Sequence, residues 1–180
     1  MTKRGILVVD LQNEYFPNGK FTLEGIGAAA INAARVMANA RSRGDLVVNI
    51  RHEAPNGPLF LPGSDGAKIN ESVLPKGDEP VITKNYPNSF RGTGLKELLD
   101  QHEVEEIVVI GAMSHMCVDA TTRAANDFGY RTITIHDACA TRDLEFNGRV
   151  TSAADVHTTL MAALAFGYGE VIGTDELLAR

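Results

Sequence analysis

Short apolar runs alternate along the chain with longer segments in which apolar residues recur at three- and four-residue steps. The apolar runs predict six strands, at residues 6–9, 46–50, 80–83, 106–110, 132–135 and 171–172. The longer segments predict helices at residues 24–42, 95–102, 118–128 and 152–166, and a further helix at the end of the chain. Such alternation is typical of a parallel sheet covered by helices. The predicted fold class is therefore α/β, with three α/β/α layers around a roughly six-stranded parallel sheet.

Two segments lack this periodicity. Residues 52–79 are rich in Gly, Pro, Asn and Asp and predict a long, partly irregular loop over one end of the sheet. Residues 138–149 predict a shorter irregular stretch. Long loops are often functional, and the sequence leaves open whether residues 52–79 move on binding. Because no linker or internal repeat interrupts the 180 residues, we expect one domain over 1–180.

Charge and cysteine usage narrow the class of partner. The formal net charge is −6 and no Lys/Arg cluster is present, so we expect a small-molecule partner and no nucleic acid. No apolar stretch approaches the roughly 18 to 20 residues that a membrane span needs, and the opening MTKRGILVVD is typical of a strand rather than a signal peptide. The two cysteines lack a CxxC spacing. We therefore expect a soluble, cytoplasmic protein without a disulfide framework or zinc ribbon.

Three residues with catalytic chemistry follow predicted strands. Asp10 ends the first strand, Lys84 ends the third, and Cys117 follows the fourth by a short turn and opens a helix. Ligands of open parallel sheets bind beyond the carboxyl ends of the strands, so these side chains are expected at one edge. A thiol near a helix N-terminus has its pKa lowered by the helix dipole. Asp10 is suited to accept and return a proton, with Lys84 holding the carboxylate ionised.

Each of these residues also has a simpler explanation. A buried cysteine is more often an inert small hydrophobe than a nucleophile. An aspartate at a strand end often forms a turn or caps a helix, and a lysine is usually a solvated surface charge. A binding protein that uses the same crevice without catalysis also remains possible. A nucleotide-binding Rossmann domain is disfavoured because no GxGxxG follows the first strand.

Three sequence blocks resemble the isochorismatase-like cysteine hydrolase superfamily. VVDLQNEYF resembles its opening D-x-Q-N motif, VITKNYPNSFRGTGL its lysine block, and VVIGAMSHMCVDATTRAA its cysteine block. The likeness continues through HDACATRDLEF and so covers nearly the whole chain. PNSFRGTGL, SHMCVDAT and HDACATRDLEF look most like the streptothricin hydrolase branch.

This resemblance implies a catalytic triad of Asp10, Lys84 and Cys117 that forms a thioester. It also implies a non-proline cis peptide at Ala112–Met113, with the backbone N–H groups of Met113 and Cys117 as oxyanion donors. The family usually assembles as homodimers or homotetramers, which the sequence cannot specify. No cofactor is implied.

Members of the superfamily catalyse different reactions. Nicotinamidases hold a metal after the second strand through a D-x-H spacing, but the corresponding NIRHEAPNG lacks it, so no metal site is expected. True isochorismatases cleave a vinyl ether, and several lack the cysteine. Its presence here favours hydrolysis of a C–N bond in an amide, lactam or carbamoyl compound, with vinyl-ether chemistry as the alternative.

Residues near the triad in sequence are candidates for substrate contact. For Phe16 and Phe90 the alternative is ordinary core packing, for His52 loop polarity, and for His115 a turn cap. His136, His157 and Cys139 are interpreted as structural. The candidate substrate contacts are Gln12, Phe16, His52, Tyr86, Phe90 and His115.

Overall fold

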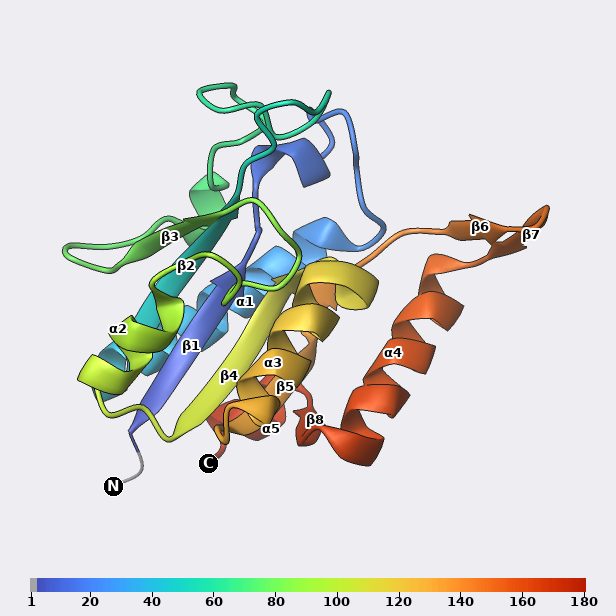
Figure 1. Ribbon diagram of the computed structural model, residues 1–180. Helices are drawn as coiled ribbons and strands as arrows, with labels where there is room; N and C mark the ends of the chain where they lie inside the picture. Colours follow the sequence, from blue (N-terminus) through green and yellow to red (C-terminus); the bar gives the residue numbers. More distant parts are fainter. Residues whose placement is uncertain (1–2) are drawn as a thin grey trace.

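The computed structural model describes residues 3–180 and contains a six-stranded sheet in the order β3-β2-β1-β4-β5-β8. All neighbouring strands of this sheet pair in parallel, as Figure 1 shows. The strands are β1 (Arg4–Val9), β2 (Leu46–His52), β3 (Val81–Lys84), β4 (Glu106–Ala112), β5 (Arg131–Ala140) and β8 (Glu170–Ile172). The predicted α/β class and the parallel sheet are confirmed.

Helices cover both faces of the sheet (Figure 1). α1 (Ile26–Arg43) and α5 (Thr174–Leu178) lie on one face, while α2 (Leu95–Gln101), α3 (Asp119–Asp127) and α4 (Ala153–Gly167) lie on the other. α1 ends where the sequence predicts, because Gly44 adopts a left-handed φ of 75° and its N–H bonds back to the helix.

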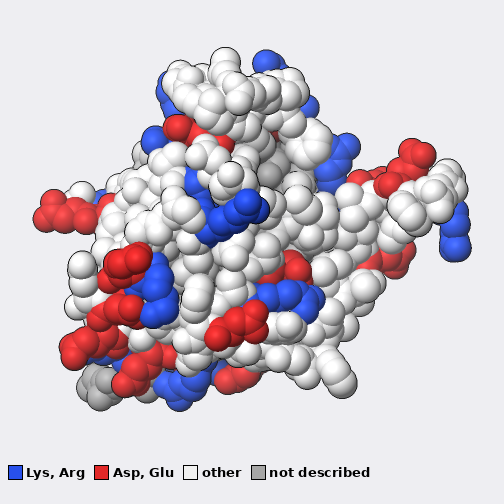
Figure 2. Space-filling view, viewed as in Figure 1, with Lys and Arg blue, Asp and Glu red and all other residues white. Residues whose placement is uncertain are grey.

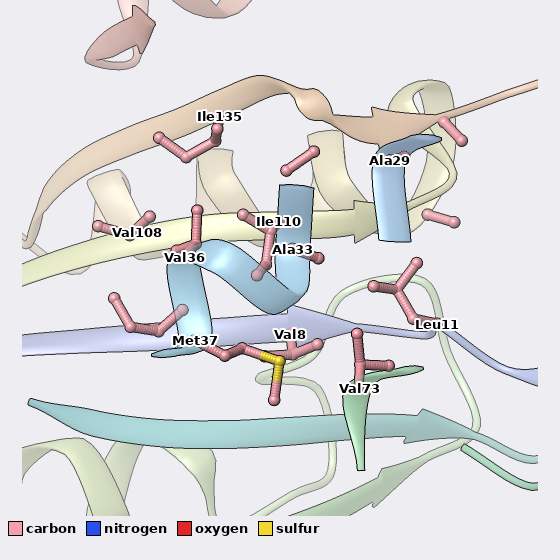
Figure 3. Packing of buried hydrophobic residues seen from close by; sticks show 14 of the residues in the cluster. Val8, Leu11, Ala29, Ala33, Val36, Met37, Val73, Val108, Ile110 and Ile135 are labelled. Atoms are coloured by element: carbon pink, nitrogen blue, oxygen red, sulfur yellow. The ribbon is translucent and has the colours of Figure 1, made fainter. Parts of the chain in front are cut away.

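The core follows from the two-residue period of the strands. Ile6 and Val8 of β1 pack into the cluster beneath α1, whereas Leu7 and Val9 pack into the cluster beneath α2 and α3. Figure 3 shows the first cluster, in which Ala33, Val36 and Met37 of α1 meet side chains from several strands. With both faces covered, the central strands β1 and β4 are buried along nearly their whole length.

Two connections close over the carboxyl edge of the sheet. One is the segment between β1 and α1, which contains the 3-10 turn η1 (Asn13–Tyr15); the other is the predicted loop 52–79, which contains η2 (Glu71–Val73). Backbone hydrogen bonds join them: Asn13 N–H to Lys68 O at 3.0 Å, Glu14 N–H to Gly66 O at 3.0 Å, and Asn70 N–H to Leu11 O at 2.9 Å. The long loop is thus fastened to the chain that follows β1.

The prediction of an irregular stretch at 138–149 is wrong. β5 continues to Ala140, and a hairpin of β6 (Leu144–Phe146) and β7 (Arg149–Thr151) projects from the body (Figure 1). Its turn is Asn147–Gly148, with φ of 52° and 75°. Asn-Gly is the favoured two-residue hairpin turn, so the signal was present in the sequence.

The surface carries both signs of charge. On the face that Figure 2 shows, Lys and Arg are interspersed with Asp and Glu, and neither sign forms a continuous field. Among the residues that the structure describes, no helix has both the length and the apolar character that a membrane crossing requires.

Candidate active site

The fold brings the three predicted catalytic residues to one place. Asp10 directly follows β1, with a φ of 51° that turns the chain away from the sheet. Lys84 is the last residue of β3, paired in register with His52 of β2. Cys117 lies in a π-helical turn, Ser114–Val118, between β4 and α3. Cys117 is therefore the fourth residue of this turn rather than the opening residue of the helix.

The Lys84 ammonium is the centre of the site. Its Nζ lies 2.7 Å from Asp10 Oδ2, 3.3 Å from Cys117 Sγ and 3.3 Å from His52 Nδ1. The side chains of Lys84 and Asp10 are completely buried, and Cys117 is 6% exposed. A carboxylate, an ammonium and a thiol from three separate parts of the chain are thus in contact.

The second carboxylate oxygen of Asp10 is unused. Oδ1 is buried and has no hydrogen-bond partner within residues 3–180. A buried carboxylate oxygen without a partner carries the full cost of its desolvation. Such an atom in a catalytic cluster is available to accept a proton.

Burial and charge set the protonation of the cluster. Burial disfavours the Lys84 ammonium, but the Asp10 carboxylate, the charge that Cys117 carries when it ionises, and the hydrogen bonds to both groups outweigh burial and raise the pKa of Lys84. Burial, followed by the Asp10 carboxylate, raises the pKa of the Cys117 thiol far above its ordinary value, although Lys84 opposes this. The predicted low thiol pKa is therefore wrong. Burial and the neighbouring Asp10 carboxylate both disfavour the thiolate at this position.

The turn that carries the cysteine is closely constrained. Gly111 has a φ of 127°, and a Cβ at that position would lie 1.9 Å from the carbonyl oxygen of Val9. Only glycine fits there. The next peptide bond, Ala112–Met113, is cis, at the position that the family resemblance implies. The Met113 carbonyl accepts the N–H groups of Met116 and Val118, the two neighbours of Cys117.

Two of the predicted substrate contacts lie beside the triad. His52 meets Lys84, and its ring contacts the Phe60 ring edge-on with centroids 5.5 Å apart. Gln12 is fully buried, and its amide bonds the backbone N–H and carbonyl of His52, both at 2.8 Å, and the carbonyl of Ala67 at 2.7 Å. Gln12 therefore holds the end of β2 and the long loop together.

The other predicted contacts are more scattered. Phe90 is 9% exposed and packs in the core with the Phe128 and Tyr130 rings. Tyr86 is 43% exposed beneath the Arg91 guanidinium. Phe90 belongs to the buried cluster that also contains Cys117.

Phe16 and His115 occupy intermediate positions. Phe16 is partly exposed and packs against the core cluster beneath α1. His115 Nδ1 lies 2.6 Å from Thr141 Oγ1, and burial, followed by the charge of Arg142, lowers the pKa of its imidazole. His115 thus joins the cysteine turn to Thr141, directly after β5, by a contact between side chains, and in the part of the chain that the structure describes the turn has no side-chain cap.

Tyr15 is a site residue that the sequence interpretation missed. It is 3% exposed, and burial, followed by the charges of Asp10 and Cys117, raises the pKa of its phenol. The phenol is thus a neutral group in the field of the triad. The sequence offers Tyr15 and Phe16 side by side, and the η1 turn rotates Tyr15 inward.

Two cavities open near this edge. One, of about 620 Å³, lies between the connection after β1 and the long loop and is lined by Glu14, Phe16, Phe60 and Ile69 among others. The second, of about 250 Å³, is lined by His136, Cys139 and His157 among others. Within the described residues, no group of three His, Cys, Asp or Glu side chains is arranged to hold a metal ion.

Comparison with known proteins gives the family. The model of the isochorismatase domain matches residues 4–176. The isochorismatase family protein YddQ of Bacillus subtilis is 43% identical over 96% of this chain and 97% of its own length. A streptothricin hydrolase of Streptomyces noursei is 33% identical over 97% of this chain, which spans 60% of that enzyme.

A solved structure from Oleispira antarctica agrees with this result. It is named an isochorismatase hydrolase, and it superposes with a TM-score of 0.96 and 48% identity over 99% of this chain and 97% of its own. The family match, the shared fold and the contact of Asp10, Lys84 and Cys117 agree. The chain belongs to the isochorismatase family of hydrolases.

Proposed function

We propose that the protein is a cysteine hydrolase that cleaves a C–N bond of a small molecule, in an amide, lactam or carbamoyl group, through a thioester on Cys117. The observation that carries this proposal is the contact geometry of the triad. Lys84 bridges the Asp10 carboxylate and the Cys117 thiol, while Asp10 Oδ1 is left without a partner. A nucleophile, a base and a charge that holds the base in place are the parts that acyl transfer requires.

The raised pKa of the thiol sets the order of the first steps. Cys117 rests as a neutral thiol, so its proton passes to Asp10 as the sulfur attacks the substrate carbonyl. The C–S bond forms and the carbonyl electrons move to the oxygen. When the tetrahedral species collapses, the C–N bond breaks and Asp10 returns the proton to the leaving nitrogen. The products are an amine or ammonia and the thioester.

Water completes the cycle. Asp10 takes a proton from a water molecule that attacks the thioester, the C–S bond breaks, and the proton returns to the sulfur. Lys84 remains protonated throughout, because the two acidic groups beside it raise its pKa. The ammonium thus balances the negative charge that moves between Asp10 and Cys117.

The backbone N–H groups of Met113 and Cys117 are proposed as the oxyanion donors. The constrained turn after Gly111 fixes the direction of both groups relative to the sulfur. Fixed donors stabilise developing charge without reorganisation, and removing one such donor typically costs roughly 10²–10³ in kcat.

The relatives favour C–N chemistry over the vinyl-ether alternative. A relative that covers nearly all of this chain is named a streptothricin hydrolase. A carboxylate that both accepts and returns a proton suits an amine leaving group, which must be protonated as it departs. We therefore take amides, lactams and carbamoyl compounds as the substrate class.

The test is a substrate screen with matched cysteine variants. Amides, lactams and carbamoyl compounds are assayed for ammonia, amine or acid release, and the thioester is sought by mass spectrometry of the intact protein. Cys117→Ala is expected to lower kcat on the order of 10³-fold or more. Cys139→Ala is the control, because Cys139 is also buried but has no contact with Lys84 or Asp10.

The outcomes separate the candidate functions. Turnover that survives in Cys117→Ala contradicts the proposal. Release of pyruvate from a vinyl ether with no activity on C–N compounds supports the isochorismatase-type alternative. A saturable ligand with no turnover and no thioester supports a binding protein.

A further inference from the structure

The Lys84 ammonium has one more hydrogen-bond acceptor than the other two triad residues provide. An ammonium has three N–H donors and no acceptor. Lys84 Nζ has three candidate acceptors: Asp10 Oδ2 at 2.7 Å, Cys117 Sγ at 3.3 Å and His52 Nδ1 at 3.3 Å. Each donor therefore has one acceptor, although the side chain is fully buried. His52 supplies the third.

This contact determines the protonation state and the tautomer of the His52 imidazole. Because the ammonium only donates, Nδ1 of His52 must present its lone pair, so the ring is neutral with its proton on Nε2. Burial, followed by the charge of Lys84, lowers the pKa of His52, while Asp10 opposes this more weakly. The protonation state that the contact requires is thus the one that the environment favours.

The histidine is held in place from two sides. The Gln12 amide bonds both the N–H and the carbonyl of its backbone at 2.8 Å. The Phe60 ring packs against its imidazole with an interplanar angle of 85°. A fixed ring presents a fixed lone pair, which is what orienting an ammonium requires.

We infer that His52 is a positioning residue that directs the third N–H of Lys84, so that the other two stay on Asp10 and Cys117 through the reaction. This inference rests on the proposed cysteine-hydrolase function. It replaces the interpretation of His52 as a substrate contact. A hydrogen-bond acceptor at the position of Nδ1, not an imidazole as such, is the feature that matters.

The inference predicts a specific pH response. Protonated His52 would direct an N–H at the Lys84 ammonium and push it from its place. The groups that face the ring are Lys84 from β3, Asp10 from the end of β1 and the uncharged Phe60. The charged residues next to His52 in the chain are Arg51 on β2 and Glu53 just after it, and they pair with each other at 3.3 Å. As pH falls through the lowered pKa of His52, kcat is expected to fall.

Asparagine and leucine at position 52 provide a matched pair. They have nearly the same shape, but only asparagine places an acceptor, Oδ1, where Nδ1 stands. His52→Leu is expected to lower kcat at least tenfold with KM within about twofold of the wild-type value. His52→Asn is expected to restore most of that loss and to remove the acid limb that His52 contributes to the kcat profile.

A second measurement needs no substrate. Nitrogen NMR of the wild-type protein at pH 7.5 is expected to show His52 neutral, protonated on Nε2, with a midpoint below the ordinary value of about 6.5. The His52→Asn spectrum identifies its signals among the 5 histidines. A His52 protonated on Nδ1 at this pH overturns the inference without any activity measurement.

The remaining outcomes are equally decisive. If His52→Asn and His52→Leu lose activity alike, or if the loss appears in KM, His52 does not act as the acceptor. If the NMR result holds but no C–N compound is hydrolysed, the contact stands and the proposed function fails. If C–N hydrolysis is found and both variants match the wild type, the function stands and the inference fails.

Discussion

The two ends of β1 carry ion pairs of the same length in different surroundings. Arg4 opens the strand, with Nε 2.7 Å from Glu106 Oε1, and Asp10 follows its end, 2.7 Å from Lys84 Nζ. The Arg4 and Glu106 side chains each remain 13% exposed, and Arg131 lies 3.9 Å from Glu106. The Asp10 and Lys84 side chains are completely buried. Solvent therefore reaches the Arg4–Glu106 pair and is excluded from the Asp10–Lys84 pair.

The difference shows that distance alone does not distinguish a structural pair from a reactive one. At the amino end, removing one partner leaves the other with solvent and a second cation. At the carboxyl end, the same change leaves a charge buried without a partner. A buried pair is weak evidence for stability, so its position beside Cys117 indicates a chemical role.

Removing the cation of each ion pair tests the difference between the two ends of β1 most directly. Lys84→Met is expected to lower the free energy of unfolding by roughly 3–5 kcal/mol, because Asp10 stays buried and unpaired. Arg4→Met is expected to lower it by about 1 kcal/mol or less. Urea unfolding at one fixed protein concentration measures both. Equal losses would contradict the contrast.

A double variant tests whether the unpaired Asp10 charge causes the loss of stability. Asp10→Asn added to Lys84→Met removes the unpaired charge, and asparagine tolerates the left-handed backbone at position 10. The double variant is expected to recover about 2 kcal/mol relative to Lys84→Met while remaining inactive. Simple addition of two destabilising effects in the urea experiment would show that the charge is not the cause.

Thiol reactivity tests the electrostatics at the carboxyl end. Because the pKa of Cys117 is raised, its thiolate fraction at pH 7 lies below that of free cysteine and increases as pH rises. Alkylation by iodoacetamide at pH 7 is expected to be at least about tenfold slower than for free cysteine, a difference of about 1.4 kcal/mol. Peptide mass spectrometry follows Cys117 and Cys139 separately. Rapid alkylation of Cys117 would restore the low-pKa interpretation.

Salt is expected to have the smallest effect. Raising the ionic strength from about 0.1 M to 1 M shortens the screening length from about 10 Å to 3 Å. The stability difference between wild type and Arg4→Met is expected to shrink by up to about 0.5 kcal/mol, whereas that for Lys84→Met stays constant. A Lys84→Met difference that falls equally with salt would mean that solvent reaches the buried pair.

Much of the architecture can be predicted from local patterns in the sequence. The apolar runs predict all six strands of the sheet, and the signal is strongest for β1 and β4, which are buried on both faces. Gly44 marks the end of α1, because only a left-handed residue closes the helix there. The positions of Asp10, Lys84 and Cys117 after their strands likewise predict one shared edge, since parallel strands place their carboxyl ends together. The Asn147–Gly148 turn is an equally local signal, because Asn-Gly favours a two-residue hairpin.

The sequence by itself therefore determined the fold and which three side chains meet. Tertiary structure alone decided their chemical state: burial beside Asp10 raises the pKa of the Cys117 thiol, and Lys84 takes His52 as its third acceptor. It also decided that Tyr15 is buried while Phe16 remains partly exposed. These properties depend on solvent exclusion and on distances between residues far apart in the chain. The local periodicity of the sequence gives no information on solvent exclusion or on those distances.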